Sequence, residues 1–521
     1  MAVPIFFFTS FGFGCALLAA CAVFLSLKAL LNRSRLSNIP AVGTSNGKEQ
    51  RRKEFMSGKA RSLYVEGYKK FKDGAFRIMT ARESECVVVP PDFLKQLKKL
   101  PDDVLSFNEA VEEALQTKYT NITSNIPTIP HTLKTSLNPA LFRLNPIILD
   151  EITQAVRTEI PPSQTWTSVP INKKLARIVA QTSGRIFVGP DLCRDETYLD
   201  AAVNYTLDMT AAVQAVGFVS PWLRPFLAAR TPQVRKLHDR FRQVDEFLRP
   251  VVTARRRAAR EGDEKKGRHD DTLQWLLDSQ DRFGEQSDRQ VSKYQLSLTF
   301  AAIHTTTAAL TNAFYDLAAR PELVPILREE IEEVVADAGG QITAAAIQKM
   351  LKLDSFLKEI MRYYPQSATA FQRKVMKPFT LPNGQTVPAG VIIEVPSHAV
   401  NNDESIYTHP ETFDVLRFYR IRKETEAALS GTTSPDDAAA EAAAGNQFAS
   451  VTETSLAFGY GRNACPGRFL AANEIKMILA TALLEYDIAL PPGCEGRYEN
   501  LNFGSQSVPD PTKSIMMRKR T

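Results

Sequence analysis

The sequence predicts a mainly α-helical fold with a minor β-sheet, and three observations support this prediction. Apolar residues at helical spacing, interrupted by prolines, fill most of the segment 91–370. Short β-rich runs occur at 76–79 and 86–90, and an Asn-Gly turn joins two short strands within 379–387. The chain has 521 residues, 44% of them hydrophobic, and can bury a large core. No linker divides its main part, so we expect one large domain over residues 60–521.

Composition narrows the possible partners. The net charge is +6 at pH 7, and the basic residues are spread along the chain rather than grouped in a stripe. Nucleic acid is therefore not an expected partner. The six cysteines show no paired spacing. This pattern fits a reducing compartment and does not fit a disulfide framework.

The N-terminal segment predicts a membrane anchor. Residues 1–27 carry no charged side chain, and their apolar stretch exceeds the roughly 20 residues that a helix needs to cross a bilayer. A cleaved signal peptide would have a basic residue before a shorter apolar core. We therefore expect a single-pass transmembrane helix over 1–27 and a basic linker over 28–59. Because the basic residues follow the apolar segment, the rest of the chain should face the cytosol.

A second segment of unusual composition lies near the C-terminus. Residues 424–449 are rich in Ala, Glu, Ser and Thr, and they have almost no large apolar face to bury. We interpret this segment as a low-complexity insertion and expect a mobile surface loop.

The stretch Phe458–Gly467 carries the strongest chemical signal. Gly459 and Gly461 allow a close approach of backbone to a flat cofactor, and Gly467 follows Cys465 where a side chain would collide with such a group. An apolar run at helical spacing comes next, so the sulfur should lie at a helix N-terminus, which favours the thiolate and metal binding. The alternative is a buried cysteine in a glycine-rich turn.

This stretch resembles the cysteine loop of the cytochrome P-450 family, whose pattern is Phe-x-x-Gly-x-(Arg/His)-x-Cys-x-Gly. Phe458, Gly461, Cys465 and Gly467 match the pattern, and Asn463 departs from it. The resemblance implies haem b with Cys465 as the proximal thiolate ligand of the iron. It also implies the cytochrome P-450 fold, a triangular α-helical haem domain, here preceded by a single transmembrane helix.

Two further motifs resemble the same family. Glu359 and Arg362 are three residues apart on one face of an apolar helix, like the Glu-x-x-Arg pair of the family. The segment 413–418 resembles the family's Phe-x-x-x-Arg-Phe and supplies Arg417. The resemblance implies a buried structural triad of Glu359, Arg362 and Arg417, which shapes the proximal side and performs no chemistry. An ordinary surface ion pair is the alternative.

Residues 296–318 are apolar nearly all round, which predicts a buried helix. Within it, the hydroxyl-rich run 304–307 resembles the distal helix of the family. The resemblance implies that Ala301 lies against the haem and that Thr305 supports proton delivery to dioxygen. His304 stands where many members carry Asp or Glu. It is either a satisfied core residue or a proton relay, and a role as second haem ligand is a further alternative.

Haem propionates need cations or donors. Arg373 resembles the propionate-binding arginine of the family, and Lys134 is a candidate for the corresponding position on an earlier helix. Arg462 is a candidate to compensate for Asn463, since an amide is a neutral donor. For each cation, an exposed charge is the alternative. Phe458, Gly459, Gly467 and Ala301 complete the expected cofactor contacts.

The resemblance also implies the segments that contact substrate. They are mainly apolar or small, which favours a hydrophobic substrate of terpenoid or polycyclic size. Core packing is the alternative for each residue. The segments are 108–129, 216–226, 367–369 and 503–505.

Together the motifs resemble filamentous-fungal microsomal members, which tailor secondary metabolites at the endoplasmic reticulum membrane. The implied reaction inserts one oxygen atom from O₂ into a C–H or C=C bond. NADPH supplies electrons through a membrane-bound cytochrome P-450 reductase, with cytochrome b5 as a further candidate donor. Arg468 and Lys476 are candidates for the reductase docking surface, with a solvated face as the alternative.

Two other functions stay open at this point. The same haem site is able to catalyse oxidative coupling, desaturation or a redox-neutral rearrangement. Outside catalysis, the chain fits a haem-binding sensor or carrier.

Overall fold

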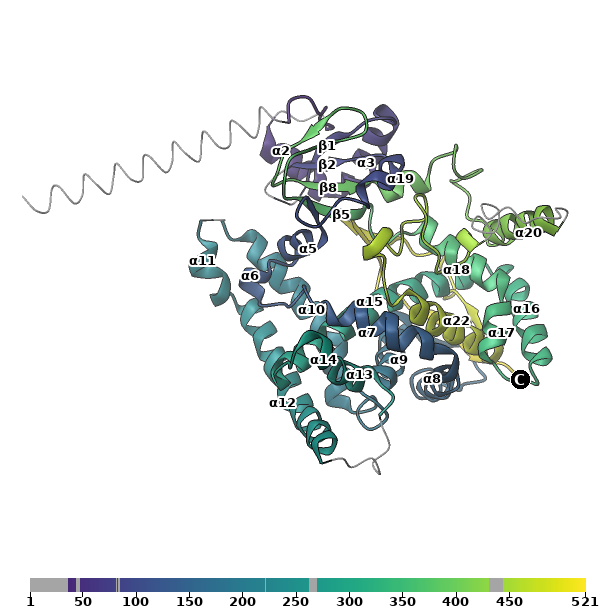
Figure 1. Ribbon diagram of the computed structural model, residues 1–521. Coiled ribbons are helices and arrows are strands. Elements are labelled where there is room, and N and C mark those ends of the chain that lie inside the picture. The colour runs from purple at the N-terminus through teal and green to yellow at the C-terminus, as the bar shows by residue number, and fades with distance from the viewer. Residues whose placement is uncertain are drawn as a thin grey trace, which may run out of the picture. The chain divides into compact units, whose positions relative to one another are not determined.

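The computed structural model describes residues 36–43, 47–80, 82, 85–220, 222–261, 269–430 and 444–521. Helices dominate and the sheets are small, as the sequence predicts (Figure 1). The expected anchor over 1–27 lies outside the described residues. Among the residues that are described, no helix combines the length and the apolar character needed to span a bilayer. The chain divides into two compact units.

The first unit contains the described residues up to Phe107 together with Phe371–Pro396. Its main sheet has the strand order β1-β2-β8-β5-β3, in which β1 and β2 are antiparallel and β2 and β8 are parallel. The strands are β1 (Phe76–Met79), β2 (Glu85–Val88), β3 (Leu105–Ser106), β5 (Ala370–Val375) and β8 (Ile392–Val395). The helices are α2 (Lys48–Glu54), η1 (Phe55–Lys59), α3 (Ala60–Lys70), η2 (Pro91–Phe93) and α4 (Leu94–Leu97).

The folded part of this unit begins earlier than residue 60. Ile39, Val42 and Phe55 are buried, although they lie in the segment that we expect to be a linker. The backbone N–H of Arg77 donates to Pro40 O, and the N–H of Val42 donates to Arg77 O, so the segment pairs with β1. The buried apolar side chains of this basic segment therefore fix it in the fold of the first unit.

The expected hairpin is present, but its turn differs from the prediction. Strands β6 (Phe379–Thr380) and β7 (Thr386–Val387) pair antiparallel. Gly384 has a φ of +84°, whereas Asn383 does not have a positive φ, and the N–H of Gly384 donates to Leu381 O. A turn centred on Pro382 and Asn383 explains the difference, because proline favours the first central position of such a turn.

The second unit contains Asn108–Ala370 and Ser397–Thr521. Most of its residues are helical, and α5 (Phe107–Leu115) begins at the unit boundary. Its first helices are α6 (Thr117–Thr120), α7 (Thr128–Thr132), η3 (Leu133–Leu137), α8 (Asn138–Glu159), α9 (Ile171–Phe187), α10 (Glu196–Phe218), α11 (Arg224–Leu227), η4 (Ala228–Arg230) and α12 (Pro232–Arg260). The later ones are α13 (Thr272–Asp278), α14 (Gln280–Phe283), α15 (Asp288–Ala319), α16 (Leu323–Asp337), α17 (Ala344–Lys349), α18 (Leu351–Tyr363), α19 (Ser397–Asn401), α20 (Arg417–Ser430), η5 (Gly461–Asn463) and α22 (Arg468–Glu485).

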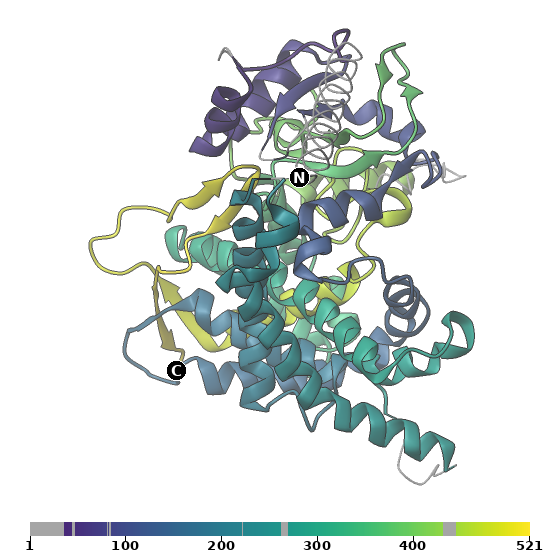
Figure 2. The ribbon, with the colours of Figure 1, turned by 90° about the vertical axis from the view of Figure 1, so that its left-hand side faces the viewer.

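Two small sheets belong to this unit, and Figure 2 shows their C-terminal strands in yellow. One has the order β4-β12-β9, and the other is the β10-β11 hairpin. Both contain only antiparallel pairs. The strands are β4 (Thr167–Val169), β9 (Tyr486–Ala489), β10 (Asn500–Phe503), β11 (Gln506–Pro509) and β12 (Ile515–Lys519).

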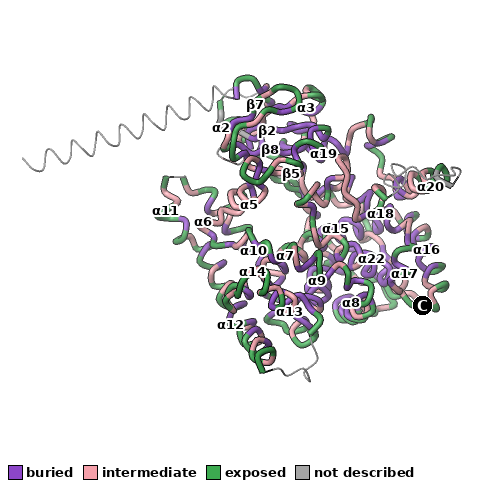
Figure 3. The backbone as a smooth tube through the Cα atoms, viewed as in Figure 1, coloured by how far each residue is buried: buried purple, intermediate pink, exposed green. Residues whose placement is uncertain are grey.

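Helix α15 is the central element of this unit's core. It begins with a capping box, in which Ser287 and Gln290 satisfy each other's backbone N–H groups. It packs against α9, α10, α12 and α22. The C-terminal half of α15 and most of α22 are buried (Figure 3). The predicted burial on all sides holds for 306–318, whereas Ala301 and Thr305 in the earlier part of the helix are exposed.

The segment 424–449 is partly helical. Residues up to Ser430 continue α20, which begins at Arg417. Residues 431–443 lie outside the described part of the chain. The expectation of a loop is therefore wrong for the beginning of the segment, where alanine and glutamate favour helix.

Candidate active site

The cysteine loop runs from Phe458 to the start of α22. The N–H of Cys465 donates to Phe458 O at 2.8 Å and closes the loop. Gly459 and Gly461 have φ values of +76° and +71°, a conformation that side chains disfavour. Helix α22 begins at Arg468, so Cys465 lies just before its N-terminus, as the sequence predicts.

Gly467 indicates that the space beside Cys465 is kept open for a ligand. Its φ is −87° and its ψ is 2°, a conformation that other residues can adopt. A Cβ atom added at Gly467 would meet no protein atom within 4 Å. Neither backbone strain nor protein packing requires a glycine here. Because Gly467 also lines the cavity described below, a group bound in that cavity accounts for it.

The Cys465 thiol opens onto the cavity, and its surroundings do not lower its pKa. Its side chain is exposed to the cavity. Burial raises the pKa of the Cys465 thiol, while the backbone N–H groups of Gly467 and Arg468 and the charge of Arg468 act in the opposite direction. Burial is the larger effect, so the helix terminus alone does not produce the expected thiolate. A metal ion bound at the sulfur would compensate, because a coordinating thiol loses its proton.

Cys465 does not belong to a cluster of three or more metal-binding side chains among the described residues. Within the described part of the chain, no three His, Cys, Asp or Glu side chains are grouped to hold a metal ion. A metal at Cys465 therefore needs a cofactor that supplies its other ligands. Haem iron, which takes one axial thiolate from the protein, fits this donor set.

Cys465 opens into a cavity of about 480 Å³ inside the second unit. Helix α15 contributes Ala301, Ala302 and Thr305 to the wall, and the cysteine loop contributes Phe458 and Gly467. Most of the other lining side chains are apolar, including Leu133, Leu298, Ala309, Leu456 and Leu470. Cavities of this size and lining hold apolar small molecules.

Thr305 lies on this wall together with a residue that the sequence did not single out. The Thr305 hydroxyl donates to Ala301 O at 2.8 Å. The side-chain amide of Gln366 donates to Thr305 O at 2.8 Å, and Gln366 also lines the cavity. Its place directly after Pro365, beside the expected substrate segment 367–369, is the signal that could have found it.

His304 points to a neighbouring helix instead. Its Nε2 lies 2.8 Å from Val203 O on α10, and His304 is not among the residues of the cavity wall. Burial lowers the pKa of His304, so the imidazole is neutral at neutral pH. The structure thus favours the satisfied core residue over the proton relay and over the haem ligand.

The structure brings Glu359, Arg362 and Arg417 together. Arg362 donates to both oxygens of the Glu359 carboxylate at 2.7 and 2.8 Å, and Arg417 Nε lies 3.2 and 3.3 Å from the same oxygens. All three residues are buried. The guanidinium groups also donate to the carbonyl oxygens of Asn401, Pro410, Thr408, His409 and Thr412. The triad therefore ties α18 to the segment that precedes α20.

None of the three cations predicted to contact the propionates is among the residues that line the cavity. Lys134 is exposed and absent from the cavity wall, whereas its neighbours Leu133 and Leu137 line it. Arg462 is exposed in the cysteine loop. Arg373 belongs to the first unit, where its guanidinium lies 4.2 Å from the Phe371 ring centroid and 5.0 Å from that of Phe107. Their roles toward a cofactor stay predictions.

Two further expectations about basic residues can be compared with the structure. Lys476 is buried, and its ammonium group lies 2.5 Å from Asp354 Oδ1. It is therefore not part of a docking surface, and the prediction for it is wrong. Arg468 is half-buried, and it donates to Ala449 O and Cys465 O. Helical periodicity alone did not reveal the acidic partner of Lys476, which lies on another helix.

Glu474 is a second residue that the sequence reasoning missed. It lies on α22, lines the cavity and is only 1% exposed. The Ser183 hydroxyl lies 3.0 and 3.1 Å from its two oxygens. Burial raises the pKa of Glu474 to about 8, so it carries a proton at neutral pH. The sequence feature that could have revealed Glu474 is a single carboxyl group within an otherwise apolar helix.

The expected substrate segments contribute unequally. Ile129 from 108–129, and Ser367 and Thr369 from 367–369, line the cavity. Among the described residues, the segments 216–226 and 503–505 contribute no lining residue.

Comparisons with known proteins agree with this site. The sequence model of the family described as "Cytochrome P450" matches residues 66–515. Cytochrome P450 monooxygenase ATR3 of Stachybotrys chlorohalonatus is 37% identical, with 84% of this chain and 89% of the relative covered. Cytochrome P450 monooxygenase braC of Annulohypoxylon truncatum is 34% identical over 95% of both chains. Cytochrome P450 monooxygenase AN1598 of Emericella nidulans is 33% identical, with 87% of this chain and 82% of the relative covered.

These relatives are named as enzymes, which favours catalysis over a sensor or carrier. The family uses haem, O₂ and electrons from a reductase. The chain therefore belongs to the cytochrome P450 family and is a monooxygenase-type oxidoreductase that incorporates oxygen.

Proposed function

We propose that the protein inserts one oxygen atom from O₂ into a hydrophobic substrate of terpenoid or polycyclic size, as a step of fungal secondary metabolite biosynthesis. One observation carries this proposal: the Cys465 sulfur and the Thr305 side chain line the same, mainly apolar cavity of about 480 Å³. Such a wall selects apolar substrates, because a charged ligand would lose its hydration without gaining partners.

The residues of the cavity fit haem b. Cys465 would bind the iron, and Gly467 leaves the neighbouring space open. Phe458, Gly459 and Ala301 would contact the ring. Arg373, Arg462 and Lys134 stay candidates for its propionates. When bound, the haem would supply the activation of O₂ and the radical chemistry, with Cys465 as the thiolate that holds its iron.

The chain's own residues position the substrate and handle protons. The apolar side chains of the cavity exclude water from the reacting atoms. The Thr305 hydroxyl can accept a proton or donate one at Oγ1, and in the structure it donates to Ala301 O. The side-chain amide of Gln366 donates a hydrogen bond to the carbonyl oxygen of Thr305. This bond restrains this part of α15.

Electrons would come from NADPH through a membrane-bound cytochrome P-450 reductase, with cytochrome b5 as a further donor. The uncharged segment 1–27 supports a location at the endoplasmic reticulum membrane, with the catalytic part in the cytosol. A lipid bilayer would then concentrate hydrophobic substrates near the enzyme.

The test uses the full-length, haem-loaded protein with its reductase and a panel of terpenoid hydrocarbons. We expect the reduced carbon monoxide complex to show the red-shifted band of thiolate ligation, and Cys465→Ala to abolish that band. Thr305→Ala changes another residue of the same cavity and is the matched control for Cys465→Ala. It should keep the band and lower the product formed per NADPH by about 10-fold or more.

Isotope labelling separates oxygen insertion from the other reactions of a haem site. Under ¹⁸O₂, each product molecule should gain one labelled atom. Products without label would contradict insertion and favour desaturation, coupling or rearrangement. A folded, haem-loaded protein without the red-shifted band would overturn the thiolate assignment itself.

A further inference from the structure

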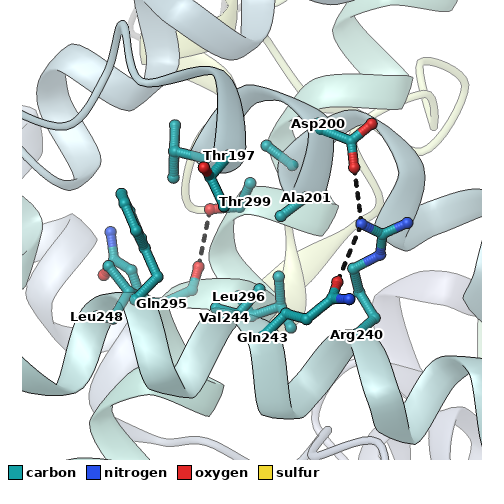
Figure 4. Close-up of a pocket in the computed structure, with 13 residues that line it drawn as sticks. Thr197, Asp200, Ala201, Arg240, Gln243, Val244, Leu248, Gln295, Leu296 and Thr299 are labelled. Carbon is teal, nitrogen blue, oxygen red and sulfur yellow. Dashed lines mark hydrogen bonds and ion pairs between the residues drawn. The ribbon is translucent and has the colours of Figure 1, made fainter.

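A second cavity lies between α10, α12 and α15 of the second unit (Figure 4). Its volume is about 350 Å³, which is within the range of small-molecule pockets. It shares no lining residue with the cavity that contains Cys465. The function proposed above therefore assigns no role to it.

The walls of the second cavity are apolar and its mouth is polar. Ala201, Val244, Leu248 and Leu296 are buried lining residues. The ring of Phe247 stacks on the ring of Tyr198 with a centroid distance of 6.5 Å. Three exposed polar residues also line the cavity, namely Thr197, Asp200 and Gln243. An apolar molecule of matching size would thus replace water along most of the wall.

The charges at the mouth balance each other. Arg240 donates to Asp200 at 2.8 Å, to Asp208 at 3.1 Å and to Gln243 at 3.4 Å (Figure 4 shows the first and third). Lys236 pairs with Asp208 at 2.7 Å. Two cations therefore face two carboxylates. Because no charge is left over, the mouth favours a neutral ligand over an ion.

Two buried lining residues have polar atoms with unmet hydrogen-bonding capacity. Tyr198 is 6% exposed and Gln295 is 1% exposed. Among the described groups, Gln295 Oε1 has no hydrogen-bond partner, and Tyr198 Oη interacts only with the Thr299 hydroxyl. The amide nitrogen of Gln295 is already used, since it donates to Phe187 O at 2.6 Å. The neighbouring Thr299 hydroxyl is also used, since it donates to Gln295 O at 2.9 Å (Figure 4).

Unmet hydrogen-bonding capacity of buried groups costs free energy. Burial raises the pKa of the Tyr198 hydroxyl and outweighs the opposing effect of the nearby Thr299 hydroxyl, so Tyr198 remains a donor at neutral pH. Gln295 Oε1 is an acceptor. A ligand hydroxyl can accept a hydrogen bond from the first group or donate one to the second.

We propose that the cavity between α10, α12 and α15 is a second ligand site, which binds a small, neutral, apolar molecule that carries a hydroxyl group. The apolar wall selects the body of this molecule, the balanced mouth selects its neutrality, and Tyr198 and Gln295 select its hydroxyl. The site lies on α15, the helix that also carries Ala301 and Thr305, but on other residues of that helix.

The test probe is 4-bromophenol, which is neutral, apolar and hydroxylated, and whose bromine can be located in crystals. Full-length haem-loaded protein is first saturated with the haem-ligating azole clotrimazole, so that the probe cannot enter the cavity at Cys465. Equilibrium dialysis then measures the remaining binding. We expect one bound equivalent, and anomalous bromine density between α10, α12 and α15. Bromobenzene, which lacks the hydroxyl, should bind more weakly.

Variants identify the residues that carry the binding. Tyr198→Phe removes the hydroxyl and should weaken 4-bromophenol binding by roughly 2- to 10-fold. Tyr205→Phe is the matched control, since Tyr205 is buried on the same helix but does not line the cavity. It should leave binding unchanged. Ala201→Leu should block binding by filling the cavity.

The proposal is overturned if the azole-saturated protein binds no probe up to its solubility limit. It is also overturned if the bromine lies elsewhere, or if Tyr198→Phe and Tyr205→Phe change binding equally. The two tyrosine variants keep the test valid even if Ala201→Leu does not fold.

Discussion

Glu359 and Glu474 are two glutamates of the second unit with almost the same burial and very different surroundings. They are 0% and 1% exposed. Glu359 accepts from the guanidinium groups of Arg362 and Arg417 and from the N–H of Asp414. Glu474 accepts from the Ser183 hydroxyl, and no cation pairs with it among the described groups. The two glutamates are therefore almost equally buried and differ in whether cations face them.

Glu359 and Glu474 also differ in their position relative to the cavity. Glu359 is on α18 and is not part of the cavity wall, whereas Glu474 is on α22 and lines the cavity with Cys465. The pKa of Glu474, raised to about 8 by burial, leaves a neutral acid on this wall. Of these two buried glutamates, only Glu359 faces two arginines, and it lies away from the cavity.

The largest expected effect comes from removing a cation from Glu359. Arg362→Met leaves a buried carboxylate with one guanidinium and leaves the carbonyls of Asn401 and Pro410 without a donor. We expect a loss of about 3–5 kcal/mol in the free energy of unfolding, measured from denaturant midpoints.

A matched control uses an exposed pair. Lys377 lies 2.6 Å from Asp103, and the two side chains are 63% and 62% exposed. Lys377→Met should cost less than about 1 kcal/mol. Equal losses for the two variants would show that burial of the triad contributes nothing.

The second-largest effect should be a pH dependence of the free energy of unfolding that is caused by Glu474. The folded protein holds this proton up to about pH 8, whereas a glutamate with the ordinary pKa of 4.5 loses it earlier. The stabilisation from Glu474 is therefore complete below pH 4.5 and is lost as the pH rises toward 8. The loss is at most about 1.4 kcal/mol per pH unit.

Glu474→Gln mimics the protonated acid and should remove this dependence. The stability difference between the Glu474→Gln variant and the wild type should therefore grow in favour of the variant from pH 5 to about 8, as measured by unfolding at each pH. Glu485→Gln on the same helix is the control and should not change with pH in this way. A constant difference for Glu474→Gln would contradict a buried, protonated acid.

The smallest effect should come from Ser183→Ala. The Ser183 hydroxyl favours the charged form of Glu474, so its removal raises the pKa of Glu474 further. We expect a loss of about 1 kcal/mol in stability and a shift of the pH dependence to higher pH. In the Glu474→Gln background the pH-dependent part should vanish. If it persists there, Ser183 acts on a group other than Glu474.

Features written within short segments were predictable from the sequence. The loop Phe458–Gly467, the pair Glu359 and Arg362, and the helix over 296–318 each depend on spacing along a few turns of chain. The structure shows the loop before α22, the ion pair with Arg417 and the buried helix. Local spacing determines these features because helix periodicity and glycine geometry act over short distances.

Contacts between distant segments were not predictable in this way. Gln366 meets Thr305, and Lys476 meets Asp354, across 61 residues in the first case. Periodicity assigns a residue to a face of its helix but does not say which helix covers that face. For this reason Lys476 was predicted to be exposed, and His304 was left with alternatives among which its contact with Val203 O favours the satisfied core residue.

By itself, the sequence determined that this chain carries a cysteine suited to haem iron, a helix suited to its distal side, and the membership of a family that activates oxygen. Only the tertiary structure decided that Cys465 and Thr305 share one apolar cavity, that Glu474 is a neutral acid on its wall, and that a second cavity lies between α10, α12 and α15. The physical reason is that burial, and the partners available where a group is buried, are properties of packed helices and not of any one segment.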